Sequence, residues 1–272
     1  MNTTLKKIKT NYFGPGWWQY LTFKICCILT PSWTIYWAAT HWDFTSIMWL
    51  YWLIIAGGLW ISLFVHRAWS HRSWKPKRWL NIVGLAVHTS FFFTNSIQWC
   101  LTHRKHHHLE DTVDDPHSPY FMNRFLIVVS PKVVKGVSLE YVKDILKDSD
   151  HIFFRKHFYT WNLILWALLY IIDPSFYLLG LWWAVMGGIS FKMRFINSIG
   201  HADPVNKSTT NRPFWAWIYL DGEPWHRNHS TDPGNWRIGR KWYEVDFGNY
   251  CIWAFEKLGW ATITQQKFKR SF

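Results

Sequence analysis

Cysteine is scarce in this 272-residue chain, where the four that occur are Cys26, Cys27, Cys100 and Cys251. None of them forms a CxxC pair, and two lie in an apolar segment. Disulfide frameworks and cysteine-type zinc sites need paired spacings that this sequence lacks. We therefore expect neither a disulfide scaffold nor a cysteine-based metal site.

Acidic residues are also few, since 17 Asp and Glu stand against 30 Lys and Arg and give a formal net charge of +13. A surplus of this size suits nucleic acid, anionic lipid or an acidic protein partner. The basic residues flank apolar stretches instead of lining one soluble face, so nucleic-acid binding is not expected. The charge indicates a membrane setting.

No internal repeat or low-complexity linker divides the chain, which predicts one domain over residues 1–272. The basic N-terminus precedes an apolar run that is too long for a signal peptide, so we expect it to be retained. After Ser230 roughly 40 residues remain, too few for a haem or flavin domain. Any electrons that the protein needs should come from a separate partner.

Lys and Arg are absent from Ile25 to Val65 and again from Phe158 to Ser190. The segment from Ile47 to Val65 has 19 residues without any charge, which is long enough to cross a bilayer. Asp173-Pro174 suits a turn inside the second stretch. The 23 Trp and 12 Tyr suit membrane interfaces. The sequence thus predicts an all-α integral membrane protein with four transmembrane helices in two hairpins, at about residues 18–40, 44–65, 158–172 and 175–191.

The turns expected within the two hairpins, residues 41–45 and 172–176, contain no Lys or Arg. The N-terminal Lys6, Lys7 and Lys9 and the stretch 67–78 are strongly basic. Cytoplasmic segments carry such an excess of positive charge. We therefore expect both termini and all large loops to be cytoplasmic.

Eight of the 14 histidines fall in short clusters. Neutral imidazole binds iron, zinc and copper, and eight ligands exceed what one ion can hold. The residues 103, 106 and 107 would project from one face of a helix, at about 0, 300 and 40 degrees. The pattern predicts a site for two metals, with these candidate ligands: His66, His71, His103, His106, His107, His201, His226 and His229.

These clusters form one site only if they emerge on the same side of the membrane. The apolar stretch 79–101 lies between the first two clusters and is too short for two crossings. We therefore expect it to be a buried or interfacial helix. His108 should face away from the other histidines, and His117 should shape a turn instead of binding metal.

The motifs HRAWSH, HRKHH followed by DDPHSP, NSIGH and GEPWHRNH resemble those of the membrane fatty acyl desaturases. They are most similar to the delta-9 group, which includes stearoyl-CoA desaturase and the bacterial acyl-lipid enzymes. The resemblance covers about Trp18 to Gly259, nearly the whole chain. Four ordered histidine clusters with this intervening hydrophobicity make the resemblance highly specific.

The resemblance implies four membrane helices under a cytoplasmic helical cap that holds a di-iron centre. Such a centre uses O2 and two electrons to form a double bond in an acyl chain. The eight histidines would be the iron ligands and the catalytic residues, and Asn197 would reach one iron through water. Trp99, just before the second cluster, is a candidate substrate contact. Cytochrome b5 or a ferredoxin would supply the electrons.

Two departures from the family pattern matter. Ser230 follows His229 where the family has a second histidine, so one iron would lack a ligand. The charged pair that engages coenzyme A in the family is missing from Trp99 to His103, which favours a lipid-linked or carrier-protein-linked acyl chain over acyl-CoA. A hydroxylase or related oxidase on the same scaffold, and a non-catalytic membrane protein of the same fold, remain alternatives.

Overall fold

The computed structural model describes residues 17–129, 138–203 and 208–264, with the backbone alone described for residues 17–25. Helices dominate this part of the chain, which confirms the helical prediction. The elements occur in this order: α2 (Trp17–Thr40), α3 (Phe44–Trp60), the π-helix η1 (Ile61–Ser70), β1 (Trp74–Pro76), α4 (Arg78–Ser90), α5 (Ser96–His108), α6 (Arg124–Val129), η2 (Leu139–Val142), η3 (Ile145–Lys147), α7 (Ser149–Lys156), α8 (Phe158–Ile172), α9 (Tyr177–Gly200), α10 (Pro213–Tyr219), α11 (His226–Thr231), α12 (Phe247–Lys257) and β2 (Ala261–Ile263).

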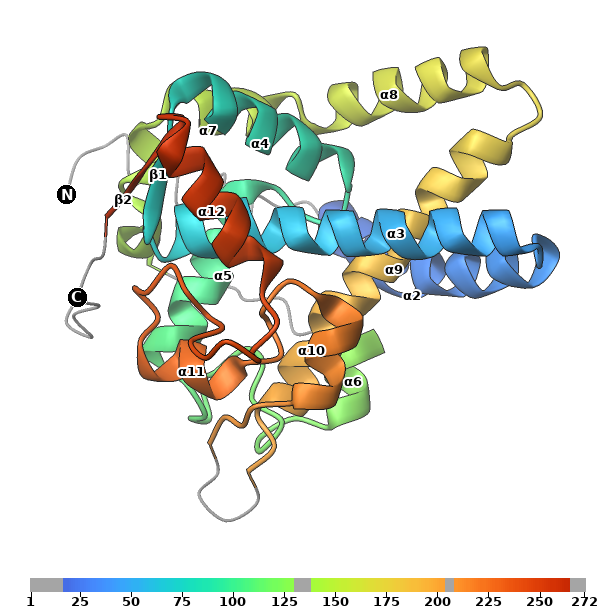
Figure 1. Cartoon of the computed structure of the whole chain (residues 1–272). Coiled ribbons are helices and arrows are strands. Elements are labelled where there is room, and N and C mark those ends of the chain that lie inside the picture. The colour runs from blue at the N-terminus through green and yellow to red at the C-terminus, as the bar shows by residue number, and fades with distance from the viewer. Residues whose placement is uncertain (1–16, 130–137, 204–207, 265–272) are drawn as a thin grey trace.

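Four long helices, α2, α3, α8 and α9, extend to one side of the molecule, and the two turns that join them lie at that far end (Figure 1). The shorter helices gather at the opposite end. Asp43 begins α3, because its carboxylate accepts a hydrogen bond from the Ser46 amide at 2.9 Å. The continuous segment Phe44–Ser70 is the one helix in the described ranges that is long and apolar enough to cross a membrane.

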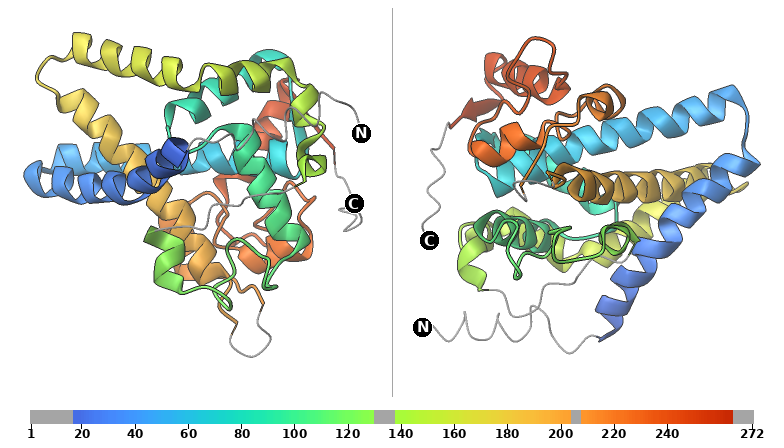
Figure 2. Two further views of the ribbon diagram at one scale, coloured as in Figure 1. Left: turned by 180° about the vertical axis from the view of Figure 1, so that it is seen from behind. Right: turned by 90° about the horizontal axis from the view of Figure 1, so that it is seen from below.

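Close helix packing joins α2 to α9 (Figure 2). The Trp33 indole donates to the Gly180 carbonyl at 2.9 Å, and the Thr34 hydroxyl donates to the Ala184 carbonyl at 2.7 Å. A Cβ atom at Gly187 would lie 2.0 Å from the Thr30 carbonyl oxygen. Only glycine therefore permits this approach of the two backbones.

The stretch 79–101, expected to be one buried or interfacial helix, belongs to two helices instead. Phe92 between α4 and α5 has a left-handed backbone with φ of 57°, which interrupts the helix. Asn95 then begins α5 by accepting a hydrogen bond from the Gln98 amide at 3.0 Å. The fourth apolar helix also differs from its predicted bounds, because α9 continues to Gly200.

A two-stranded antiparallel sheet pairs the segment that follows η1 with the C-terminal end of the described residues. Trp74 of β1 pairs with Ile263 of β2, and Pro76 pairs with Ala261. Next to it, the Thr264 amide donates to the Ser73 carbonyl at 3.1 Å. The sheet thus holds the C-terminal part of the described chain against the loop that follows the first histidine cluster.

Candidate metal centre

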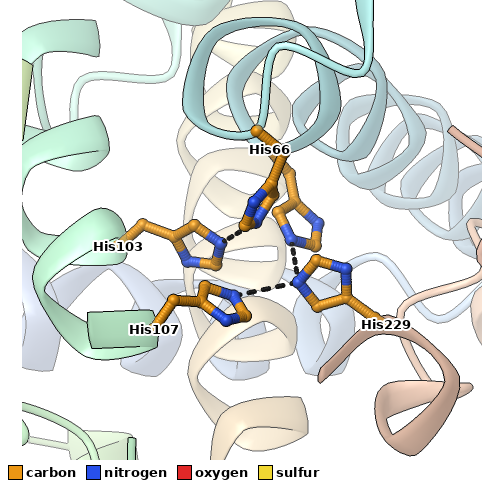
Figure 3. A group of neighbouring side chains, drawn as sticks. His66, His103, His107 and His229 are labelled. Atoms are coloured by element: carbon orange, nitrogen blue, oxygen red, sulfur yellow. Dashed lines mark hydrogen bonds between the residues drawn. The ribbon is translucent and has the colours of Figure 1, made fainter. Parts of the chain in front are cut away.

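The eight predicted histidines come together in two adjacent groups. Within each group the candidate ligand atoms all lie within 4.8 Å of one another. The first group has five members and the second has three: His66, His71, His103, His107 and His229, then His106, His201 and His226. Figure 3 shows labelled rings of the first group pointing toward one another from η1, α5 and α11.

The π-helix explains how the first cluster can supply two side chains to one group. In an α-helix, residues five apart point about 140 degrees away from each other. In η1 the His71 amide donates to the His66 carbonyl at 3.1 Å, a bond across five residues. This wider turn brings the two side chains to one side of the helix, where their rings meet edge to face with centroids 4.9 Å apart.

Helix α5 carries four histidines and divides three of them between the two groups. His103 and His107 are one turn apart and join the first group, whereas His106 joins the second. The three share a helix face as expected, but they straddle the boundary between the groups. His108 is exposed, belongs to neither group and has its ring 5.7 Å from that of Tyr141.

The buried Arg104 connects α5 to the end of η1. Its guanidinium donates to the carbonyls of Ser70 at 2.8 Å and Trp69 at 2.5 Å, and it pairs with Asp144 at 2.7 Å. A second buried arginine, Arg67, pairs with Asp246 at 2.8 Å. These ion pairs hold the elements that carry the first two histidine clusters.

The Nε2 atoms converge in pairs inside the groups. The distances are 2.8 Å from His71 to His103, 2.9 Å from His229 to both His66 and His107, and 2.9 Å from His201 to His226. Nitrogens this close to one another cannot all carry a proton. Several Nε2 lone pairs are therefore directed toward a common point in each group.

Carboxylates contact the opposite ring nitrogen of three of these histidines. The Nδ1 atom lies 2.6 Å from Glu223 in His66, 2.8 Å from Asp115 in His106, and 3.1 Å from Asp111 in His201. A carboxylate that accepts from Nδ1 leaves the Nε2 lone pair for a metal, an arrangement typical of metal-binding histidines. The sequence analysis missed these three carboxylates, although all of them lie within nine residues of a histidine cluster.

Burial keeps most of these rings neutral. It holds the pKa of His71, His103, His107, His226 and His229 well below the ordinary value. Burial also acts on His106, but the hydrogen bond and the charge of Asp115 outweigh it and raise the His106 pKa. Neutral imidazole is the form that binds metal ions. The donor set therefore fits two cations, one in each group.

Three other predicted site residues lie close to these groups. Trp99 stacks on His103, with ring centroids 4.6 Å apart. Asn197 is half-buried on α9, one turn before His201. Ser230 is buried, and its hydroxyl has no hydrogen-bond partner among the described residues. His229 belongs to the five-membered group, and the second group has three histidines.

The fold and these residues define a helical protein with two buried histidine groups that could each hold a metal ion. A family model described as fatty acid desaturase matches residues 44–246. The chain therefore belongs to the fatty acid desaturase family, whose members are membrane-associated oxidoreductases of lipid metabolism.

Relatives in this family include enzymes named for different substrates. The chain is 32% identical over 220 residues to "Delta-9 desaturase-like 3 protein" of Arabidopsis thaliana, and the matched residues cover 76% of this chain and 73% of the relative. It is 31% identical over 231 residues to "sn-1 stearoyl-lipid 9-desaturase" of Anabaena variabilis, with 78% and 80% covered. It is 30% identical over 253 residues to "Acyl-CoA C20 Delta5-desaturase" of Anemone leveillei, with 88% and 77% covered.

Proposed function

We propose that this protein is an O2-dependent di-iron desaturase that introduces a delta-9-like double bond into a lipid-linked or carrier-linked acyl chain. The observation that carries the proposal is the convergence of eight histidines, seven of them buried, into two adjoining groups with carboxylates behind three of them. When bound, the irons would supply the activation of O2. Family membership and the name of the stearoyl-lipid relative support the acyl substrate.

The two irons would have unequal ligand sets. The first would take five imidazoles, and the second would take His106, His201 and His226 with Asn197 acting through water. Ser230 leaves a position open beside the second group. The protein residues around both groups exclude water, and burial favours the neutral form of five of the eight rings. A separate donor of the cytochrome b5 or ferredoxin type would deliver the electrons, drawn by the basic charge of the chain.

The direct test is product analysis of lipids from cells that express the chain together with an electron donor. We expect a new monounsaturated acyl group at the 9 position in the wild type, and none with His106→Ala, which removes a candidate ligand. A hydroxylated product would support the alternative oxidase. Saturated lipids alone, from protein that is folded but holds less than two irons, would favour the non-catalytic alternative.

We also propose four membrane spans at about residues 18–40, 44–65, 158–172 and 175–191, formed by α2, α3 with the start of η1, α8 and the first part of α9, with the histidine groups on the cytoplasmic side. Cysteines engineered at the exposed Lys75 and Thr231 should react with an impermeant reagent from the cytoplasm, whereas one at the exposed Trp42 should not. The native cysteines are first replaced by alanine. Labelling of Lys75 and Thr231 from opposite sides would contradict the topology.

A further inference from the structure

Arg194 on α9 is a buried cation without a carboxylate partner. Its side chain is 9% exposed, comparable with Arg67, Arg104 and Lys192 at 1%, 2% and 5%. Each of those three has an acidic partner, at 2.8, 2.7 and 2.7 Å. All 17 Asp and Glu of the chain lie in the described ranges, and none of them forms an ion pair with Arg194. A buried charge is costly unless it is paired.

The hydrogen bonds of Arg194 do not use all of its guanidinium donors. The Nε atom donates to the Ser190 carbonyl at 2.9 Å, and the Nη1 atom donates to the Cys27 carbonyl of α2 at 3.1 Å. The Nη2 atom is buried and has no acceptor among the described residues. A guanidinium group binds phosphate and carboxylate through parallel N–H donors. The unused N–H groups of Arg194 could therefore bind an anion.

The position of Arg194 relates this cation to the histidine groups. It lies seven residues before His201, which places it about 10 Å back along the axis of α9 and on nearly the same helix face. It also follows the proposed membrane span by one turn. In the proposed topology Arg194 lies toward the cytoplasmic side of the membrane, from which it could meet a lipid head group while the chain of the bound lipid extends toward the second histidine group.

We infer that Arg194 binds the anionic head group, a phosphate or carboxylate, of the acyl lipid on which the enzyme acts. The inference rests on the proposed desaturase function and specifies its substrate class. Arg124 is exposed at the start of α6, and its carbonyl accepts from Ser198 on α9 at 3.4 Å, so a second basic residue lies near the same part of α9. An anionic lipid would provide the counter-charge that the chain itself does not.

Binding of two lipids with the same stearoyl chain tests this inference on the iron-loaded protein in neutral detergent. Stearoyl lysophosphatidic acid carries a phosphate, and monostearoylglycerol does not. We expect the wild type to bind the phosphate lipid at least about tenfold more tightly, a difference of about 1.4 kcal/mol. Arg194→Gln should remove this preference, and Arg194→Lys should retain part of it. The control Lys257→Gln removes an exposed charge and should keep the full preference.

Iron content and the affinity for monostearoylglycerol separate a binding role from a structural one. Both should be unchanged in Arg194→Gln, because the neutral lipid makes no use of the guanidinium. Equal binding of the two lipids by the wild type, or loss of both lipids by Arg194→Gln, would overturn the inference. So would full displacement of lysophosphatidic acid by an equal concentration of inorganic phosphate, which would show a free-anion site. This assay needs no turnover, so a failed desaturation test would leave its result interpretable.

Discussion

Glu223 offers a way to perturb the first histidine group without touching a candidate ligand. Its carboxylate is buried, lies 2.6 Å from His66 Nδ1 and accepts a hydrogen bond from the Ser62 hydroxyl at 2.6 Å. Burial alone would raise the Glu223 pKa, but the charge and hydrogen bond of His66 outweigh it and lower the pKa to about 2. The carboxylate is therefore charged throughout the range in which the enzyme would be assayed.

The expected loss of iron affinity follows from what each substitution of Glu223 removes. Partners of this kind contribute about 10–100-fold to metal affinity. Glu223→Gln keeps an acceptor oxygen for His66 but loses the charge, so we expect the lower end, a loss of about tenfold. Glu223→Ala loses both the acceptor and the charge, so we expect a loss of about 100-fold.

The assay is competition for iron between the purified protein and a graded series of chelators, with bound metal measured by mass spectrometry. Glu140→Gln is the control, because this carboxylate is exposed and pairs with Lys143 at the surface. It should release iron like the wild type. Retention of iron by Glu223→Ala at wild-type affinity would refute the role of the carboxylate in holding His66.

Three further predictions concern stability and metal content. Burial lowers the His88 pKa to about 3, so only the unfolded chain binds this proton as the pH falls below 6.5. The free energy of unfolding, measured by urea titration, should drop by about 2 kcal/mol per such group between pH 7 and 5. In His88→Leu it should fall less steeply with pH. Gly187→Val should lower stability by about 1–3 kcal/mol through its clash with Thr30, whereas Gly180→Ala, with an ordinary 3.4 Å contact, should not. When iron is limiting, Ser230→His should raise the iron occupancy of the second group; unchanged occupancy would show that another group completes it.

Charge and hydropathy in the sequence were sufficient to locate the long helices. The predicted segments 18–40 and 158–172 agree closely with α2 and α8, because charges and the Asp173-Pro174 pair mark their ends. The end of α9 was not predictable in this way. Lys192 stays in the helix because it pairs with Asp221, a contact between residues 29 positions apart in the sequence.

The histidine clusters were recognisable from spacing, but their division into two groups was not. The bond from His71 to His66 depends on a π-helix, which no local sequence pattern specified. The position of His229 depends on tertiary contacts with His66 and His107. The supporting carboxylates could have been found by searching near each cluster for acids, because metal-binding histidines commonly have such partners.

Iron content per chain tests the central claim of two metal sites most directly. The wild type, purified in detergent and loaded anaerobically, should hold about two irons. His106→Ala should hold about one, because His106 belongs only to the three-membered group. His103→Ala should weaken the other iron while leaving the second group intact. One iron or none in the wild type, or two in His106→Ala, would contradict the assignment.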